Sequence, residues 1–213
     1  MLRFTLFAIF VASASAVSVI FEDGPCPNFK PMSNFDFSAY GGTWYEIAKF
    51  PNPSEEGDKA KCTLIEYFVK EFRGKMKFTH VVDGARKYIE GDLTQVYPGS
   101  GKIMYTYTFG GKAKNTYLYV MDTDYNNYAV AFSCRYFKDS DKHQLLAWIL
   151  SRNKVLEGNA LAAVDKFLAA NSKLINTSYF VQNEHTNEAC KARTTEEITE
   201  FLKIYETNPN LID

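Results

Sequence analysis

The most regular feature of this chain is an alternation of side chains with a period of two. Ile103, Tyr105, Tyr107 and Phe109 occupy one set of positions, and the residues between them occupy the other. Successive side chains of a β-strand point to opposite faces, so this alternation predicts a strand with one buried face. The same pattern predicts eight strands, over residues 43–50, 62–69, 75–82, 86–95, 103–109, 116–122, 128–137 and 144–151.

The segments between these strands carry residues typical of tight turns. Examples are Asp83-Gly84, Gly110-Gly111 and the run Pro98-Gly99-Ser100-Gly101. Glycine tolerates positive φ angles, and Asp and Pro favour turn geometry. Short turns between regularly spaced strands predict an all-β, antiparallel fold, and the pattern alone leaves a barrel and a sandwich both open.

One segment, residues 156–171, has helical spacing instead. Leu161, Val164 and Leu168 recur three or four residues apart there, among several alanines. This spacing predicts one amphipathic helix that packs on the outside of the sheet.

The two ends of the chain differ from the part between them. Residues 1–16 combine Arg3, an apolar run and a small-residue cleavage site, which predicts a signal peptide and a secreted mature chain of one domain over 17–190. The tail, 191–213, is polar and acidic. Thr194 and Glu197 match a helix capping box, which predicts a short helix there, with a disordered tail as the alternative.

Charge and aromatic content narrow the function classes. The chain has 24 Lys and Arg against 25 Asp and Glu, a net charge of -1, which argues against a nucleic-acid partner or a basic membrane-binding surface. The apolar run at the N-terminus is too short to span a bilayer. The chain also carries 14 Tyr, 17 Phe and 2 Trp, ring side chains that favour pleated sheets.

Reactive residues point to disulfides rather than to catalysis. In an oxidising compartment the four cysteines predict two disulfides, and three pairings are possible. The histidines, His80, His143 and His185, lack the spacing of metal ligands, and no hydrolase, metalloprotease or phosphate-loop motif occurs. We therefore expect no metal and no catalytic residue. Asn176-Thr177-Ser178 is a formal glycosylation sequon.

Three short motifs occur in a characteristic order. They are Gly42-Thr43-Trp44, Thr123-Asp124-Tyr125 and Ser151-Arg152. In this order, and followed by one helix, they resemble the lipocalin family. The resemblance implies an eight-stranded up-and-down barrel whose closed end is filled by Trp44, with the Arg152 guanidinium over its indole.

The resemblance extends to the insect bilin-binding lipocalins, the insecticyanin type. It rests on Asp23-Gly24-Pro25-Cys26-Pro27, Trp44-Tyr45-Glu46-Ile47-Ala48-Lys49, Tyr88-Ile89-Glu90-Gly91 and the run 148–156. It implies the disulfide pairs Cys26–Cys134 and Cys62–Cys190. Two departures are a slightly longer loop at 51–61, at the barrel mouth, and the tail after Cys190.

The same resemblance implies a binding site. The ligand would be biliverdin, of the IXγ or a close isomer, held without a covalent bond as the chromophore of a blue pigment protein. Aromatic rings would stack on it, His80 would hydrogen-bond it, and Lys114 and Arg135 would face its propionates. The family's inward positions fall on Phe78, His80, Ile89, Tyr105, Tyr107, Phe109, Lys114, Thr116, Leu118, Ser133, Arg135, Gln144, Leu146 and Trp148.

Other functions remain open at this stage. An aromatic slot also suits a retinoid, carotenoid, fatty acid or pheromone. A few lipocalins are enzymes, and their prostaglandin-type activity uses an unpaired cysteine inside the barrel; a structural protein would bind no ligand. The family also allows a homo-oligomer.

Overall fold

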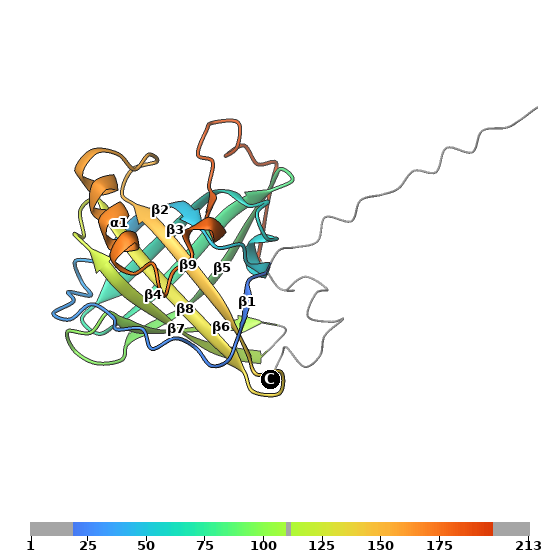
Figure 1. Ribbon diagram of the computed structural model, residues 1–213. Helices are drawn as coiled ribbons and strands as arrows, with labels where there is room; N and C mark the ends of the chain where they lie inside the picture. The colour runs from blue at the N-terminus through green and yellow to red at the C-terminus, as the bar shows by residue number, and fades with distance from the viewer. Residues whose placement is uncertain (1–18, 110–111, 198–213) are drawn as a thin grey trace, which may run out of the picture.

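The computed structural model describes residues 19–109 and 112–197, and its main feature is one closed sheet. Each long strand is antiparallel to the next, and the last pairs with the first, which closes the barrel (Figure 1). The eight-stranded barrel is therefore confirmed, and the sandwich is excluded. Its strands are β2 (Gly42–Lys49), β3 (Lys61–Lys70), β4 (Arg73–Val82), β5 (Ala85–Gln95), β6 (Lys102–Phe109), β7 (Lys112–Thr123), β8 (Tyr128–Phe137) and β9 (Lys142–Ser151).

Several shorter elements pair with the barrel strands or lie in the loops between them. Two of them pair with its strands, β1 (Phe21–Asp23) with β9 and β10 (Val181–Gln182) with β2. Two 3-10 turns, η1 (Pro53–Glu55) and η2 (Thr177–Tyr179), lie in loops. The three-residue and two-residue strands were not predicted, because segments so short show no alternation.

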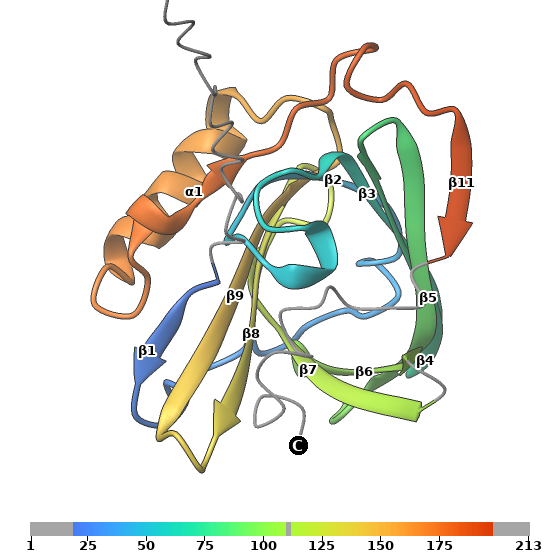
Figure 2. The ribbon, with the colours of Figure 1, turned by 90° about the vertical axis from the view of Figure 1, so that its right-hand side faces the viewer.

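The predicted helix is present as α1 (Gly158–Ala170). It begins two residues later than expected because Glu157 is extended, with φ -148°, and serves as the N-cap. Val164 and Leu168 are buried against the outer surface of β8 and β9. Figure 2 shows α1 outside the ring of strands, as the amphipathic spacing predicts.

The prediction for the tail was wrong where the structure describes it. Thr194–Glu197 forms a strand, β11, that pairs in parallel with Ala85–Tyr88 of β5, and it is neither helical nor without structure. The physical reason is an open edge: β5 pairs with β6 only from Gly91 onward, so its earlier backbone groups are free to pair with the tail. Residues 198–213, like the predicted signal peptide at 1–16, lie outside the described residues.

Two apolar cores flank the sheet. The inner core lies inside the barrel and includes Trp44, Ile65, Leu93 and Ile103, while the outer core lies between the sheet and α1. Along β9, Leu150 belongs to the inner core and Ile149 to the outer core. This alternation fixes which face of each strand looks inward.

Both disulfides have the pairing that the family implies. Cys26 bonds Cys134 of β8 and Cys62 of β3 bonds Cys190, with Cα–Cα distances of 5.9 and 5.1 Å. Together they use all four cysteines.

The motif residues meet at the closed end of the barrel. The Arg152 guanidinium carbon lies 3.7 Å from the centroid of the fully buried Trp44 ring. The same side chain donates to the carbonyl oxygens of Gly41, Thr43 and Tyr125 at 2.7–2.9 Å. Gly42 has a φ of 89°, and a Cβ there would lie 3.3 Å from an Arg152 nitrogen, so glycine fits this position.

The motif Thr123-Asp124-Tyr125 stabilises the same closed end of the barrel. Asp124 accepts hydrogen bonds from the backbone N–H groups of Asn126, Asn127 and Tyr128, which fixes the β7–β8 turn. The Thr123 hydroxyl donates to the Tyr128 carbonyl oxygen. Tyr125 is thereby held where its carbonyl receives Arg152.

Candidate functional site

The residues predicted to line a pocket lie on strands β4 to β9, and the register places them on one face. Phe78 lies opposite Ile89, and Arg135 lies opposite Gln144. Directly opposed residues of antiparallel strands share a face. Members that pack in or against the inner core are Phe78, Ile89, Tyr105, Tyr107, Leu118 and Trp148. Members joined to them by register are Lys114, Thr116, Ser133, Gln144 and Leu146.

Phe109 is the one predicted residue that the structure cannot place in full. It ends β6, opposite Lys112, but its side chain lies outside the described part.

Aromatic rings dominate this inner surface. The Tyr105 and Tyr107 rings stack with centroids 5.0 Å apart and planes 18° apart. The Phe78 ring meets the His80 ring edge-on, with centroids 5.6 Å apart. Such a surface can hold a flat, conjugated molecule by stacking.

Polar side chains interrupt the aromatic surface toward the mouth. The hydroxyl oxygens of Thr116 and Ser133 lie 3.2 Å apart, across β7 and β8. Arg135 is half-buried, with its guanidinium carbon 5.1 Å from the Phe137 ring centroid. Lys114 is also half-buried and lies opposite Tyr107.

A buried charged cluster, which the sequence did not predict as part of the site, lies near these residues. Glu46, Lys49 and Glu55 are each at most 1% exposed. The Lys49 ammonium pairs with the Glu55 carboxylate and lies 3.6 Å from Glu46 Oε1. Asn52 donates its side-chain N–H to Glu55 Oε1 at 2.6 Å.

A bulge in β2 brings Glu46 and Lys49 to the same side. Glu46 lies opposite Leu150 and Lys49 opposite Trp148, and both partners pack with the inner core. The register shifts between Glu46 and Ala48. Strict alternation would turn Lys49 outward, so the cluster could not be read in full from the pattern, although the Trp44-x-Glu46 spacing indicates Glu46.

Burial decides the protonation of this region. Loss of water, and then the Glu55 charge, raise the pKa of Glu46 to about 8, with Lys49 offsetting part of the rise. Glu46 is therefore mostly protonated at neutral pH, which leaves Lys49 and Glu55 as one ion pair. Burial also lowers the pKa of His80 to about 4, so its imidazole is neutral.

The loop that contributes Asn52 and Glu55 lies at the mouth of the barrel. In Figure 2 it is the cyan segment that crosses the ring of strands on the side nearest the viewer. A second ion pair, Lys87 with Glu56, ties this loop to β5.

Several buried polar atoms of the inner side chains have no hydrogen-bond partner among the described residues. Buried polar groups in native proteins are almost always paired, so each such atom needs an explanation. Some of them donate and others accept. They are both ring nitrogens of His80, the Tyr105 hydroxyl, Trp148 Nε1, Glu46 Oε2 and, beside Trp44, the Tyr40 hydroxyl.

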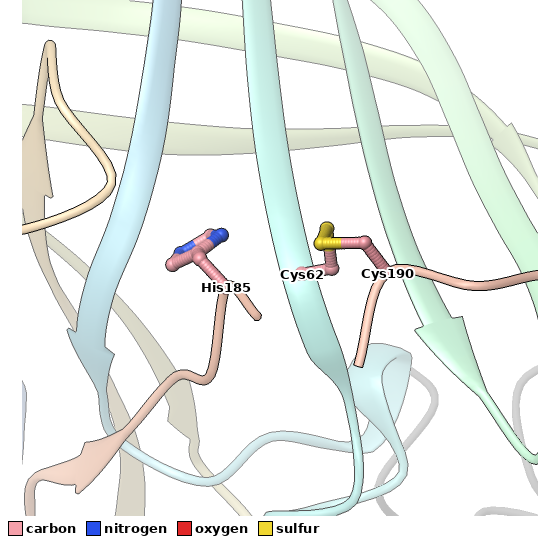
Figure 3. A group of neighbouring side chains, drawn as sticks. All are labelled: Cys62, His185 and Cys190. Atoms are coloured by element: carbon pink, nitrogen blue, oxygen red, sulfur yellow. A yellow bond between two sulfur atoms is a disulfide. The ribbon is translucent and has the colours of Figure 1, made fainter. Parts of the chain in front are cut away.

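A further group lies on the outer side of the mouth. Figure 3 shows His185 beside the disulfide of Cys62 and Cys190, and one potential metal-ligand atom of each lies within 4.8 Å of the others. The two sulfur atoms bond each other, so neither is a thiolate that could bind a metal. His185 instead donates from Nε2 to the Glu46 carbonyl oxygen at 2.6 Å.

The helices give one further structural fact. Within residues 19–109 and 112–197, none is both long and apolar enough to cross a membrane.

A closed up-and-down barrel with an aromatic interior and buried, unpaired polar atoms is the architecture of a carrier for a small, largely apolar molecule. Comparison with known proteins agrees. Residues 41–187 match the lipocalin / cytosolic fatty-acid binding protein family, and the chain belongs to the lipocalins.

Individual relatives cover nearly all of the chain. Insecticyanin-B of Manduca sexta is 40% identical over 93% of this chain and 98% of its own. The bilin-binding protein of Pieris brassicae is 37% identical over 89% of this chain and 98% of its own. The solved structure of Manduca sexta insecticyanin superposes with a TM-score of 0.79 at 40% identity, covering 85% of this chain and 97% of that one.

Proposed function

We propose that this chain is a secreted, non-enzymatic carrier that binds a bilin without a covalent bond and serves as a blue pigment protein. The ligand is biliverdin, of the IXγ or a close isomer. Support comes from the lipocalin barrel and from the relative named a bilin-binding protein. The disulfides leave no thiol for covalent attachment.

The observation that carries this proposal is the set of unpaired polar atoms on the inner surface. Tyr105, Trp148 and the protonated Glu46 carboxyl, at Oε2, offer donors, and neutral His80 offers a donor on one ring nitrogen and an acceptor on the other. A bilin has ring nitrogens along its length and a lactam carbonyl on each end ring, and it can pair with both kinds. A carotenoid has few polar atoms, and a retinoid or fatty acid has them at one end only.

The remaining lining residues have roles that suit a bilin. Tyr107 and Trp148 stack on its conjugated plane, and Lys114 and Arg135 receive its propionates toward the mouth.

Titration with biliverdin isomers, retinol and a carotenoid tests the proposal, with absorbance and Trp fluorescence as readouts. We expect saturation at one bilin per chain and a sharper, shifted red absorption band, because the barrel fixes the chromophore's conformation. Tyr107→Ala and Arg135→Ala should weaken binding, while Tyr117→Ala, on the outer face of β7 and 41% exposed, is the matched control.

A single-atom variant tests the polar argument itself. Tyr105→Phe removes only the buried hydroxyl, so it should cost about tenfold in bilin affinity and leave retinol affinity unchanged. Trp148→Phe removes the N–H together with part of the stacking ring, so it should weaken bilin binding through both losses. Tight retinol or fatty-acid binding with no bilin response would make the chain a carrier of another ligand class.

A further inference from the structure

The sequence carries one complete acceptor motif for an N-linked glycan, Asn176-Thr177-Ser178. Such a glycan is attached to an asparagine that lies two residues before a serine or threonine, with any residue except proline between them. No other asparagine of the full sequence meets this condition, and Asn52-Pro53-Ser54 fails it only through its proline. Because the pattern is short, whether Asn176 can carry a glycan depends on where the fold places it.

The motif forms an exposed turn between two anchored residues. All three of its residues are exposed. Ile175, directly before the motif, is 2% exposed and belongs to the outer core. On the other side, Tyr179 and Phe180 pack on the Phe50 ring, with centroids 5.7 and 4.6 Å away. Packing on both sides therefore holds the motif in a defined turn that faces the solvent.

This turn lies on the opposite side of the sheet from the candidate binding site. Ile175, Tyr179 and Phe180 pack in or against the outer core, whereas the aromatic residues of the candidate site pack with the inner core. Figure 2 shows α1 and the chain that follows it outside the ring of strands. A glycan at Asn176 is therefore attached outside the barrel and displaces no residue of the candidate site.

The hydrogen bonds of the Asn176 side chain leave its nitrogen available. Oδ1 accepts from the Ser178 backbone N–H at 3.1 Å and from the Ser178 hydroxyl at 2.7 Å, which caps the η2 turn. No side-chain hydrogen bond of Asn176 within residues 19–109 and 112–197 uses Nδ2. An amide nitrogen has two N–H bonds, and glycosylation replaces one of them. The modified side chain therefore keeps both hydrogen bonds and the turn.

Asn52 shows the opposite arrangement. It is 2% exposed, and its Nδ2 donates to Glu55 Oε1 at 2.6 Å inside the buried charged cluster. A sugar on this nitrogen would enter the protein interior beside an ion pair. The fold thus accommodates a glycan at the one asparagine that has the complete motif.

We propose that Asn176 carries one N-linked glycan in the secreted protein. The donor is an oligosaccharide linked through a diphosphate to a lipid. Nδ2 forms a bond to C1 of the first sugar and loses one proton, the bond from C1 to the diphosphate oxygen breaks, and the lipid diphosphate leaves. The inference rests on the secretory route of the proposed function and not on the bilin.

The mass of the secreted chain tests the proposal. The full chain, with its own leader, is expressed in cultured insect cells and purified from the medium. A peptide-N-glycosidase that accepts core-fucosylated glycans should lower its intact mass by one oligosaccharide and convert one asparagine to aspartate, which peptide mapping should locate at position 176. A secreted parent chain whose mass does not change on this treatment would overturn the proposal.

Variants of the motif separate the glycan from the turn. Asn176→Asp keeps an oxygen that accepts both hydrogen bonds and removes only the attachment nitrogen, so it should lose the glycan and still be secreted. Ser178→Ala should also lose the glycan, and Ser178→Thr, which keeps the motif, should retain it. Asn187→Asp, at an exposed asparagine outside any such motif, is the matched control and should retain it. A glycan that persists in Asn176→Asp would contradict the assignment.

Two further measurements separate this proposal from the proposed function. In the first, residues 17–213 are expressed behind a proven signal peptide. A glycan in this arm alone would refute the leader prediction and support the site, and an unmodified chain in both arms would reject the site. In the second, biliverdin titration of the parent and Asn176→Asp chains should give equal affinities. If neither chain binds biliverdin, the bilin proposal fails while the masses still test Asn176.

Discussion

Arg152 holds several chain segments together at the closed end of the barrel, because it uses its hydrogen-bond donors and its charge at once. Its guanidinium covers the Trp44 ring and donates to carbonyl oxygens from β2, from the residue before β2 and from the β7–β8 turn. A planar, five-donor cation is the only side chain that can stack and donate in this way.

We therefore expect Arg152→Ala to lower the free energy of unfolding by about 3 kcal/mol, from the lost cation–π contact and charged hydrogen bonds. Arg152→Lys keeps the charge but not the planar fork, so it should recover less than half of the loss. Urea unfolding measures both. A fully stable lysine variant would show that charge alone matters at this position.

The raised pKa of Glu46 predicts an unusual pH dependence of the free energy of unfolding. Its pKa is raised from 4.5 to about 8 by burial and by the Glu55 charge, so the folded chain keeps a proton that the unfolded chain loses. Stability should therefore fall as pH rises toward 8. The lowered pKa of His80 acts in the opposite direction, mainly between pH 4 and about pH 7, where the unfolded imidazole holds a proton that the folded one does not.

Urea unfolding at pH 6.5 and pH 8 isolates the Glu46 effect. The parent chain should lose about 2 kcal/mol over this interval. Glu46→Gln, which cannot ionise, should lose much less. Parallel pH curves for the two chains would show that Glu46 does not titrate in this range.

At the scale of elements, the pairing of β5 with β6 depends on one glycine. Gly91 lies opposite Tyr107 where the two strands begin to pair. A Cβ at Gly91 would lie 2.4 Å from the Thr106 carbonyl oxygen and 2.4 Å from the Tyr105 ring. The close approach of the strands and the placement of the Tyr105–Tyr107 stack both require the missing side chain.

Gly91→Ala should therefore destabilise the fold by about 2 kcal/mol, because overpacking against backbone cannot be relieved by a rotamer change. It should also weaken bilin binding, since Tyr105 must move. Glu90→Ala, which removes only an exposed ion pair with Lys77, is the neighbouring control and should change stability by less than about 1 kcal/mol. Equal effects from the two variants would argue against the steric explanation.

At the scale of the whole molecule, the two disulfides and the leader pattern of residues 1–16 point to the same compartment. We expect the secreted chain to begin at Val17. Ala16→Arg should block cleavage, because the cleavage site requires a small residue. Intact mass and N-terminal sequencing decide this, and a secreted chain that retains Met1 would contradict the prediction.

The sequence by itself determined the barrel strands, the helix and the closed end. Period-two alternation located all eight strands to within a few residues, because each has one face toward a packed interior. The motif residues Trp44 and Arg152 could be placed in contact through the family resemblance, and the inward parity of β4 to β9 followed from the same alignment.

Only the tertiary structure determined which residues and strand pairings form the mouth of the barrel. The β2 bulge turns Lys49 inward beside Glu46, and the unpaired edge of β5 makes Thr194–Glu197 a strand although its residues match a helix cap. Asn183, far along the chain, completes the gap between β2 and β3. Local pattern determines which face of a strand is buried, but which backbone edge remains unpaired, and what fills it, depends on segments that meet only when the chain has folded.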